Sequence, residues 1–430
     1  MPGSEQSGLV RAIGRWSLAA LVINSVVGSG IFGLPSDVAR LIGRSSPWAV
    51  LLAGTAAGII MACFAEVASQ FTQAGGPYLY TRVAFGRLVG IEMGWMLWLV
   101  RLAAPAATAD LFVIYCGEFW PHANDPFPRF LILTFLYGVL TLINYRGVRA
   151  STQVSNVFTV AKLVPLFLVV IAGAFYVLAG HKAAPLLPGG AGPGAWLKAC
   201  LLLVFAYGGF ETALTPLSEA KNPRRDAAFA LFTALITCTL LYSAIQWAVV
   251  VILPDPGQSA RPLADVARLV FGNGGAAFVS VGALVSVYGY LSANILGVPR
   301  ITYALAENGD FPAIFAAIHP RFRTPYVSIL AFALLSWLLA LLGSFTWNAT
   351  LSAVARLLYY GLVCAALPVL RRKQPGAAMF RLPGGNVFAV LGVTICAVMI
   401  TGVNLGGSLI LLATALVAAL NWALVRRQAS

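Results

Sequence analysis

Charged residues are scarce in this chain of 430 residues: Asp, Glu, Lys and Arg make up 10% of it, and hydrophobic residues make up 60%. Soluble domains carry about 25% charged residues, so the composition excludes an ordinary soluble domain and predicts a polytopic membrane protein. The chain has only three histidines, and its six cysteines are scattered with no C-x-x-C pair. We therefore expect no disulfide framework, no metal site and no cofactor.

Motifs for enzyme chemistry inside a bilayer are also missing. The chain has no H-E-x-x-H and no G-x-S-x-G sequence, and no polar connection in it is long enough for a soluble catalytic domain. These absences argue against a membrane enzyme. The lack of a filter-like motif argues against a channel.

Apolar segments of the length that crosses a bilayer recur along the chain and predict an all-α fold with twelve transmembrane helices. The expected spans lie near 16–40, 48–69, 88–116, 130–145, 154–178, 196–218, 227–253, 276–298, 327–342, 350–370, 387–404 and 408–425. With both termini on the inner, cytoplasmic side of the cell membrane, 18 of the 28 Lys and Arg residues fall inside and 7 outside. This excess agrees with the positive-inside rule and explains the net charge of +14 without a nucleic acid partner.

Glycines interrupt two of these spans. The first contains Gly28-Ser29-Gly30-Ile31-Phe32-Gly33-Leu34-Pro35, and the sixth contains Val204-Phe205-Ala206-Tyr207-Gly208-Gly209-Phe210-Glu211. Broken backbone survives at membrane depth only where it lines a protein cavity, and Gly-interrupted segments at matching places in two halves indicate a midplane binding site. The alternative is that these small residues only let helices pack closely.

The two breaks offer complementary chemistry. Backbone amides of Ser29 to Ile31, at the start of a half-helix, would face an anion. Carbonyls near Val26, Phe205 and Gly208 would accept hydrogen bonds from an ammonium group. Together they match the backbone of an α-amino acid.

Three motifs carry a resemblance to a known family: Gly28-Ser29-Gly30-Ile31-Phe32, Gly75-Gly76-Pro77-Tyr78, and Phe205-Ala206-Tyr207-Gly208-Gly209-Phe210-Glu211 running to Glu219-Ala220-Lys221-Asn222-Pro223-Arg224-Arg225. They resemble motifs of the amino acid/polyamine/organocation (APC) superfamily, and the likeness covers about residues 12–425. It implies a LeuT-type fold with alternating access. The expected parts are a cytoplasmic tail (1–15), two inverted five-helix repeats (16–180 and 196–372), two further helices (385–425) and a second tail (426–430).

The resemblance also implies a set of site residues. The amides of Ser29, Gly30 and Ile31 and the Ser29 hydroxyl would hold the carboxylate of the substrate, and Phe205 would cover it as an aromatic gate. The full expected substrate-binding set is Val26, Gly28, Ser29, Gly30, Ile31, Phe205, Ala206, Tyr207, Gly208, Arg101 and Asn294. Asn294 has a second interpretation, a hydrogen bond between helices.

Lys162 lies within the fifth expected span, where an ammonium group is costly enough to need a partner or a task. It either extends to the inner interface or acts in the site. This segment looks like that of heteromeric-transporter-like exchangers, in which a lysine replaces a sodium ion. On that basis Lys162 would reach a carbonyl near Gly30 and one hydroxyl of the eighth span, from Ser286, Tyr290 or Ser292, and transport would not need sodium.

Three other charged residues within the expected spans have roles that the sequence leaves open or places at a span end. Arg101, at the centre of the third span, either pairs with Glu211 or Asp110, which leaves the pocket neutral, or selects an acidic side chain. Glu211 belongs either to a gate or proton path or to a cap on the second half-helix. Arg356 is placed close to the outer end of its span.

The expected function is secondary active transport of free amino acids by a sodium-independent exchanger or proton symporter in the inner membrane. We favour neutral amino acids, with acidic ones selected by Arg101 as the alternative. An amino acid sensor of the same fold, without transport, is the other hypothesis. The sequence leaves open whether protons take part and whether the protein is an oligomer.

Overall fold

The computed structural model describes residues 14–71, 76–147, 152–180, 191–214 and 222–428. Within these residues the secondary structure is helical and contains no strand. The helices are α1 Arg15–Val26, α2 Gly30–Ile42, α3 Ser46–Ala68, α4 Gly76–Phe85, α5 Arg87–Cys116, α6 Pro126–Tyr145, α7 Thr152–Leu178, α8 Pro193–Tyr207, α9 Phe210–Ala213, α10 Pro223–Ile252, α11 Pro262–Glu307, α12 Tyr326–Leu342, α13 Phe345–Lys373, α14 Gly385–Ile400 and α15 Leu405–Gln428.

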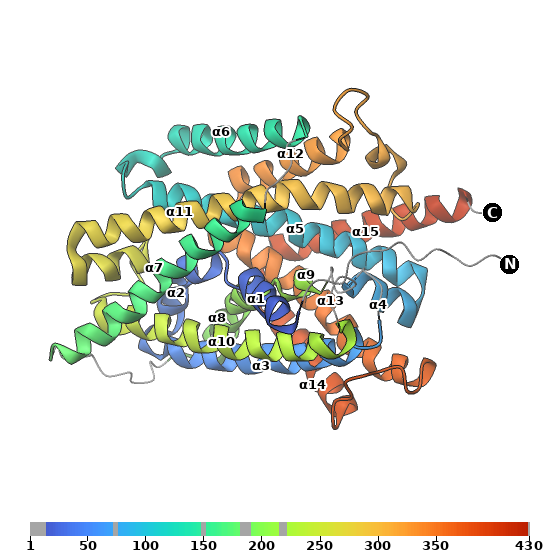
Figure 1. The fold of residues 1–430 in the computed structure, drawn as a ribbon, viewed down its shortest axis with the longest axis horizontal. Helices are drawn as coiled ribbons and strands as arrows, with labels where there is room; N and C mark the ends of the chain where they lie inside the picture. Colours follow the sequence, from blue (N-terminus) through green and yellow to red (C-terminus); the bar gives the residue numbers. More distant parts are fainter. Residues whose placement is uncertain (1–13, 72–75, 148–151, 181–190, 215–221, 429–430) are drawn as a thin grey trace.

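Within the described residues, eight helical segments are long and apolar enough to cross a membrane, and three shorter apolar helices accompany them. The helices run past one another in one bundle, with α1, α8 and α9 in its middle (Figure 1). Many large apolar side chains on the outer helices are exposed, for example Phe135, Leu178 and Leu412. Such an apolar surface suits lipid and not water, so the fold is that of a polytopic membrane protein.

Both predicted glycine interruptions are breaks in the structure. The first expected span is divided into α1 and α2, which leaves Val27 to Ser29 between them. The sixth is divided at Gly208, whose backbone is extended, and at Gly209, which has a φ of 109°. The expected continuation of this span from residue 215 to 218 lies outside the described residues, and so do the first three residues, 219–221, of the motif that starts at Glu219.

The two breaks touch each other through their backbones. A side chain at Gly30 would place its Cβ 2.9 Å from the Cα of Ala206, and one at Gly209 would place it 2.4 Å from the carbonyl oxygen of Ser25. Only glycine allows such an approach. The glycines therefore act as packing residues and as breaks at once, so the two interpretations of the sequence do not compete.

The glycines and proline of Gly75-Gly76-Pro77-Tyr78 predict a turn-rich loop after the second expected span, but helix α4 begins at Gly76. Pro77 lies at the first turn of this helix, where a missing N–H costs nothing. Further along the chain, Gly309 before Phe311-Pro312 predicts the end of the helix that continues out of the eighth span. In the structure α11 ends at Glu307 and Gly309 has a φ of 71°, which agrees.

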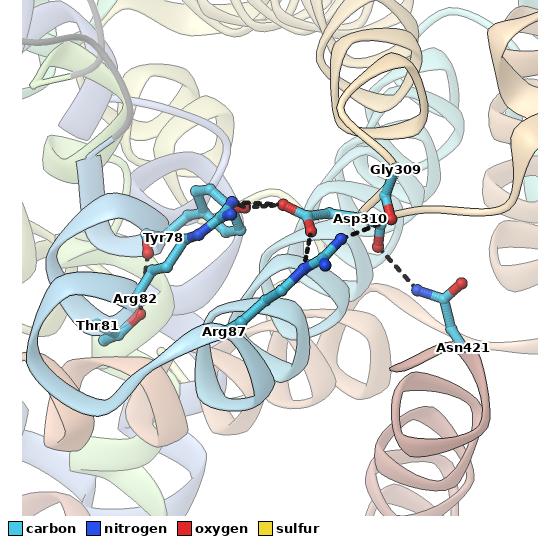
Figure 2. A network of polar contacts seen from close by, with 7 residues as sticks. All are labelled: Tyr78, Thr81, Arg82, Arg87, Gly309, Asp310 and Asn421. Atoms are coloured by element: carbon cyan, nitrogen blue, oxygen red, sulfur yellow. Dashed lines mark hydrogen bonds and ion pairs between the residues drawn. The ribbon is translucent and has the colours of Figure 1, made fainter. Parts of the chain in front are cut away.

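Helix α4 is attached to the rest of the bundle by a polar network around Asp310, which Figure 2 shows. The carboxylate of Asp310 is buried and accepts hydrogen bonds from Arg82 Nη1 at 2.7 Å, from Arg87 Nε at 3.1 Å and from the hydroxyl of Tyr78. The carbonyl of Asp310 accepts one from Asn421 in α15 at 2.7 Å. Burial and the hydrogen bond to Asp310 raise the pKa of Tyr78 to about 12, so this hydroxyl stays protonated and able to donate at physiological pH.

We expect Asp310→Asn to lower the free energy of unfolding by about 2 kcal/mol, because it removes the charge that Arg82 and Arg87 share and such hydrogen bonds contribute ~1.5–3 kcal/mol. Both arginines are about 40% exposed, so water limits the loss. Thermal melting in detergent measures the change. Asp255→Asn, in an exposed loop, is the control; equal melting of the two variants would contradict the structural role of Asp310.

Candidate functional site

A cavity of about 620 Å³ lies where the two breaks meet. This volume falls within the range of small-molecule sites. Its walls come from both breaks and from α5, α6, α7, α11 and α13, and it is lined by Asn24, Ser25, Val26, Val27, Gly28, Ser29, Gly30, Val100, Arg101, Ala104, Ile143, Asn144, Lys162, Phe205, Gly208, Gly209, Thr212, Ser286, Gly289, Tyr290, Ser292, Ala293, Asn294, Leu296, Gly297 and Arg356.

Most of the residues predicted for the site line this cavity. Ile31, Ala206, Tyr207 and Glu211 do not. Tyr207 is buried and its hydroxyl donates to the carbonyl of Val50 at 3.0 Å, which makes it a packing residue. Ala206 is the residue against which Gly30 packs.

Unpaired amides mark the start of α2. Among the described residues, the backbone N–H groups of Ser29, Gly30 and Ile31 donate no hydrogen bond. The first N–H groups of a helix lack partners inside it, and the positive end of the helix dipole favours an anion beside them. Ser29 and Gly30 line the cavity, so their amides can bind an anionic group there.

The hydroxyl of Ser29 is already engaged. Its Oγ lies 2.8 Å from Oγ1 of Thr108 in α5, and Thr108 also donates to the carbonyl of Ala104. With its one proton committed there, Thr108 accepts from Ser29. The serine thus fixes the break against α5, and an anion at this place depends on the amides.

The carbonyls of the breaks are less free than the sequence suggested. The hydroxyl of Tyr242 lies 3.0 Å from the carbonyl oxygen of Val26 and 3.2 Å from that of Ala206, so it ties the two breaks together. The carbonyl of Phe205 accepts only a long bond of 3.4 Å from the N–H of Gly208. Of the predicted ammonium acceptors that line the cavity, Phe205 and Gly208 fit and Val26 is occupied.

Lys162 projects from α7 to the end of α1. Its Nζ donates to the carbonyls of Asn24 at 2.5 Å and Val27 at 2.7 Å. These carbonyls lie on the α1 side of the break, three residues or more before the predicted Gly30. In the described part of the chain, Lys162 makes no hydrogen bond to Ser286, Tyr290 or Ser292, although all three line the same cavity.

Arg101 does not form either predicted ion pair within the described residues. Its Nη2 donates to the hydroxyl of Thr212 in the sixth-span segment at 2.7 Å. Asp110 is instead bound to Arg129 at 2.8 Å and to the amide of Asn348 at 3.1 Å. Of the two alternatives for Arg101, the described residues do not form the ion pair with Glu211 or Asp110, because the distances between these helices are not contained in the sequence.

Glu211 is buried behind the cavity and accepts three hydrogen bonds. Its donors are the hydroxyls of Tyr359 at 2.7 Å and Tyr360 at 2.9 Å and the N–H of Gly209 at 2.9 Å. The bond to Gly209 places its carboxylate at the start of α9, in accordance with the cap interpretation.

Arg356 is the site residue that the sequence analysis misplaced. It was expected near the outer end of its span, yet it is 6% exposed and lines the cavity. Its guanidinium lies against Gly208, where an added Cβ would come within 1.3 Å of Nη1. Nε is 3.9 Å from Glu211 Oε1, too far for a hydrogen bond, and Nε and Nη1 have no hydrogen-bond partner among the described residues.

Phe205 and Asn294 complete the walls. The ring of Phe205 meets that of Phe345 edge to face at 6.3 Å, so an aromatic pair closes this part of the site. The amide of Asn294 donates to the carbonyl of Tyr290 in its own helix at 2.9 Å. The second interpretation of Asn294 was a hydrogen bond between helices. In the described structure its hydrogen bond lies within α11.

The family model described as "Amino acid permease" matches residues 13–424. The chain is 28% identical over 417 residues to the methylthioribose transporter of Bacillus subtilis, covering 91% of this chain and 88% of that protein. It is 28% identical over 423 residues to the branched-chain amino acid permease BcaP of the same organism, covering 94% and 90%. It is also 27% identical over 407 residues to cationic amino acid transporter 4 of Mus musculus, covering 89% and 63%.

Proposed function

Because the chain belongs to the amino acid permease family, we propose that it carries free amino acids across a membrane and binds them in the cavity between the two breaks. The observation that carries this proposal is the pair of unpaired amides at Ser29 and Gly30 beside the weakly engaged carbonyl of Phe205. An α-carboxylate and an α-ammonium need these two kinds of partner next to each other. The family also indicates that the protein is a membrane transporter and not an enzyme.

Alternating access is the mechanism we propose, on twelve spans arranged as two inverted repeats (16–180 and 196–372) with two further helices (385–425). In this proposal α1 with α2, and α8 with α9, are the two broken spans. Their backbone contact at Gly30 and Ala206 supports a site shared by both repeats. We place the protein in the inner membrane of the cell. The excess of basic residues on one side sets its orientation, with both tails (1–15 and 426–430) in the cytoplasm.

Counterflow tests this proposal. Proteoliposomes loaded with an unlabelled amino acid mixture are expected to accumulate a radiolabelled amino acid above its equilibrium level, because exchange traps label inside. A sensor of the same fold would bind amino acids, detected as a rise in melting temperature, without accumulating label. Binding without accumulation would therefore favour the sensor.

Sodium independence is a separate part of the proposal, carried by Lys162. Its ammonium group bridges carbonyls of Asn24 and Val27 and so supplies positive charge beside the first break. We expect uptake to be the same in sodium and in choline medium, within about twofold. We expect Lys162→Met to lower uptake at least tenfold, because two carbonyls then lose a charged donor and such bonds contribute ~1.5–3 kcal/mol.

The control for Lys162→Met is Lys373→Met, which removes a lysine at the exposed end of α13. Uptake that collapses in choline would contradict sodium independence and leave the transport proposal intact. An unchanged rate in Lys162→Met would contradict the role of the lysine.

The coupling mode follows from a pH gradient experiment. A proton symporter accumulates label when the outside is acidified, whereas an obligatory exchanger responds only to amino acid on the opposite side. We propose exchange or proton symport and leave the choice to this measurement.

A further inference from the structure

We infer that Arg101 and Arg356 form a second anion subsite in the cavity, and that the protein takes amino acids whose side chain carries a negative charge. This inference rests on the proposed function, since it names the substrate class of the same site. The sequence had offered neutral amino acids first, on the assumption that Arg101 is paired, and that pairing is absent from the described structure.

The charges around the cavity are unbalanced. Arg101, Lys162 and Arg356 line it, and among the residues that the structure describes no Asp or Glu is part of its lining. The nearest carboxylate, that of Glu211, is buried behind it and already holds three donors. Buried charges within a membrane protein usually pair or serve a function, so at least one cation here lacks a partner that a ligand can supply.

Arg356 has the most unused binding capacity. Its side chain is 93% buried, and both Nε and Nη1 lack a hydrogen-bond partner among the described residues. A guanidinium offers its donors in a planar fork that matches a carboxylate. Leaving such donors buried and unpaired is costly, and a carboxylate brought by the ligand removes that cost.

Arg101, which lines the cavity from α5, also supports an anion subsite. Its Nη2 donates to the neutral hydroxyl of Thr212, and Arg101 forms no ion pair with a carboxylate among the described residues. Arg101 precedes Thr108, the partner of Ser29, by seven residues on α5, which is ~10 Å along a helix. The backbone of Arg101 thus lies at another level than the amides at Ser29 and Gly30, as the second carboxylate of an acidic amino acid requires. The guanidinium of Arg356 lies against Gly208 of the sixth-span break.

Lys162 is less suited to this role, because two of the three N–H donors of its ammonium group are engaged by the carbonyls of Asn24 and Val27. A cationic side chain would add another positive charge beside Arg101 and Arg356 and is excluded by repulsion. A neutral side chain would leave Nε and Nη1 of Arg356 without a hydrogen-bond acceptor among the described residues, and Glu211 would remain the one carboxylate within ion-pair distance of that guanidinium there. The chain therefore differs in selectivity from the cationic and branched-chain transporters to which it is similar.

Counterflow with three labels distinguishes the possibilities. Proteoliposomes loaded with unlabelled L-glutamate, L-leucine or L-lysine are assayed with the same amino acid labelled. We expect glutamate exchange to exceed leucine exchange at least tenfold and lysine exchange to be undetectable. Exchange of leucine or lysine that excess glutamate does not inhibit would overturn the anion subsite and leave the proposed function standing. No exchange of any of the twenty amino acids, by protein that melts cooperatively, would overturn both.

Arginine variants locate the subsite. In Arg101→Gln and in Arg356→Gln we expect KM for glutamate to rise roughly tenfold or more and the ratio of glutamate to leucine exchange to fall. Arg101→Lys and Arg356→Lys keep the charge without the fork and are expected to restore part of that ratio. Arg372→Gln removes an exposed cation outside the cavity and is the matched control.

The ratio of the two exchange rates within one preparation separates selectivity from stability, because damage to the fold lowers both rates together. If Arg356→Gln does not fold, Arg101→Gln, which is only partly buried, carries the test. An unchanged ratio in every folded variant would overturn the inference.

Discussion

Glu211→Gln is expected to lower the free energy of unfolding by about 3–5 kcal/mol, the usual cost of removing one partner of a buried charge pair. Glu211 is 3% exposed and is the carboxylate nearest to Arg356. A glutamine keeps the shape but loses the charge, and its amide group would point donors at the hydroxyls of Tyr359 or Tyr360. The variant therefore leaves the guanidinium uncompensated and disturbs two further hydrogen bonds.

Melting in detergent and chemical unfolding measure the loss. Glu307→Gln is the matched control, because Glu307 is exposed at the end of α11 and its loss is expected to stay within about 0.5 kcal/mol. The double variant Glu211→Gln/Arg356→Gln removes both charges, and we expect it to be more stable than the sum of the single changes predicts. Additive losses would mean that the two side chains do not interact across their 3.9 Å separation.

The melting temperature of Glu211→Gln also tests whether glutamate binds at Arg356. If glutamate binds to Arg356, saturating glutamate is expected to raise the melting temperature of Glu211→Gln more than that of the unmodified protein, because the ligand then supplies the anion that the variant lacks. Leucine offers no such anion and is expected to raise both melting temperatures equally.

The breaks were predictable from the sequence because their signal is local. A run of glycines inside an apolar span has few explanations, and both runs lie where the helices stop, at Val27 to Ser29 and at Gly208 and Gly209. The family resemblance led us to expect Lys162 at the first break near Gly30, and its ammonium group does reach that break, without the expected hydroxyl of the eighth span among the described residues. Which carbonyls it finds, Asn24 and Val27, depends on how deep α7 lies.

The sequence did not predict the positions of residues that depend on packing between helices far apart in the chain. The expected tenth span began at residue 350, but α13 begins at Phe345, and five residues move the helix start by ~7.5 Å. This shift carries Arg356 from near one end of the expected span toward the middle of the helix. Thr212, the partner of Arg101, gave no sequence signal either, because a threonine in a membrane helix usually bonds to its own backbone.

Gly209→Ala is expected to cost about 2–5 kcal/mol, because two penalties combine at this position. Gly209 has a φ of 109°, a conformation that costs an L-residue ~1–2 kcal/mol. Its Cβ would also lie 2.4 Å from the carbonyl oxygen of Ser25, and overpacking of this kind costs ~1–3 kcal/mol. The obstacle is backbone and not a rotatable side chain, so the two breaks must separate.

Gly384→Ala distinguishes the two penalties. Gly384 has a left-handed backbone like Gly209, with a φ of 65°, but a Cβ there would meet no atom within 4 Å, so this control shows only the conformational cost. Gly209→Ala is expected to be less stable than the control by ~1–3 kcal/mol and to lose amino acid binding, while Gly384→Ala keeps it. Separation of the breaks would move the amides of Ser29 and Gly30 away from the carbonyl of Phe205, and the site needs both at once. Equal melting and equal binding in the two variants would mean that the contact between Gly209 and Ser25 does not hold the cavity together.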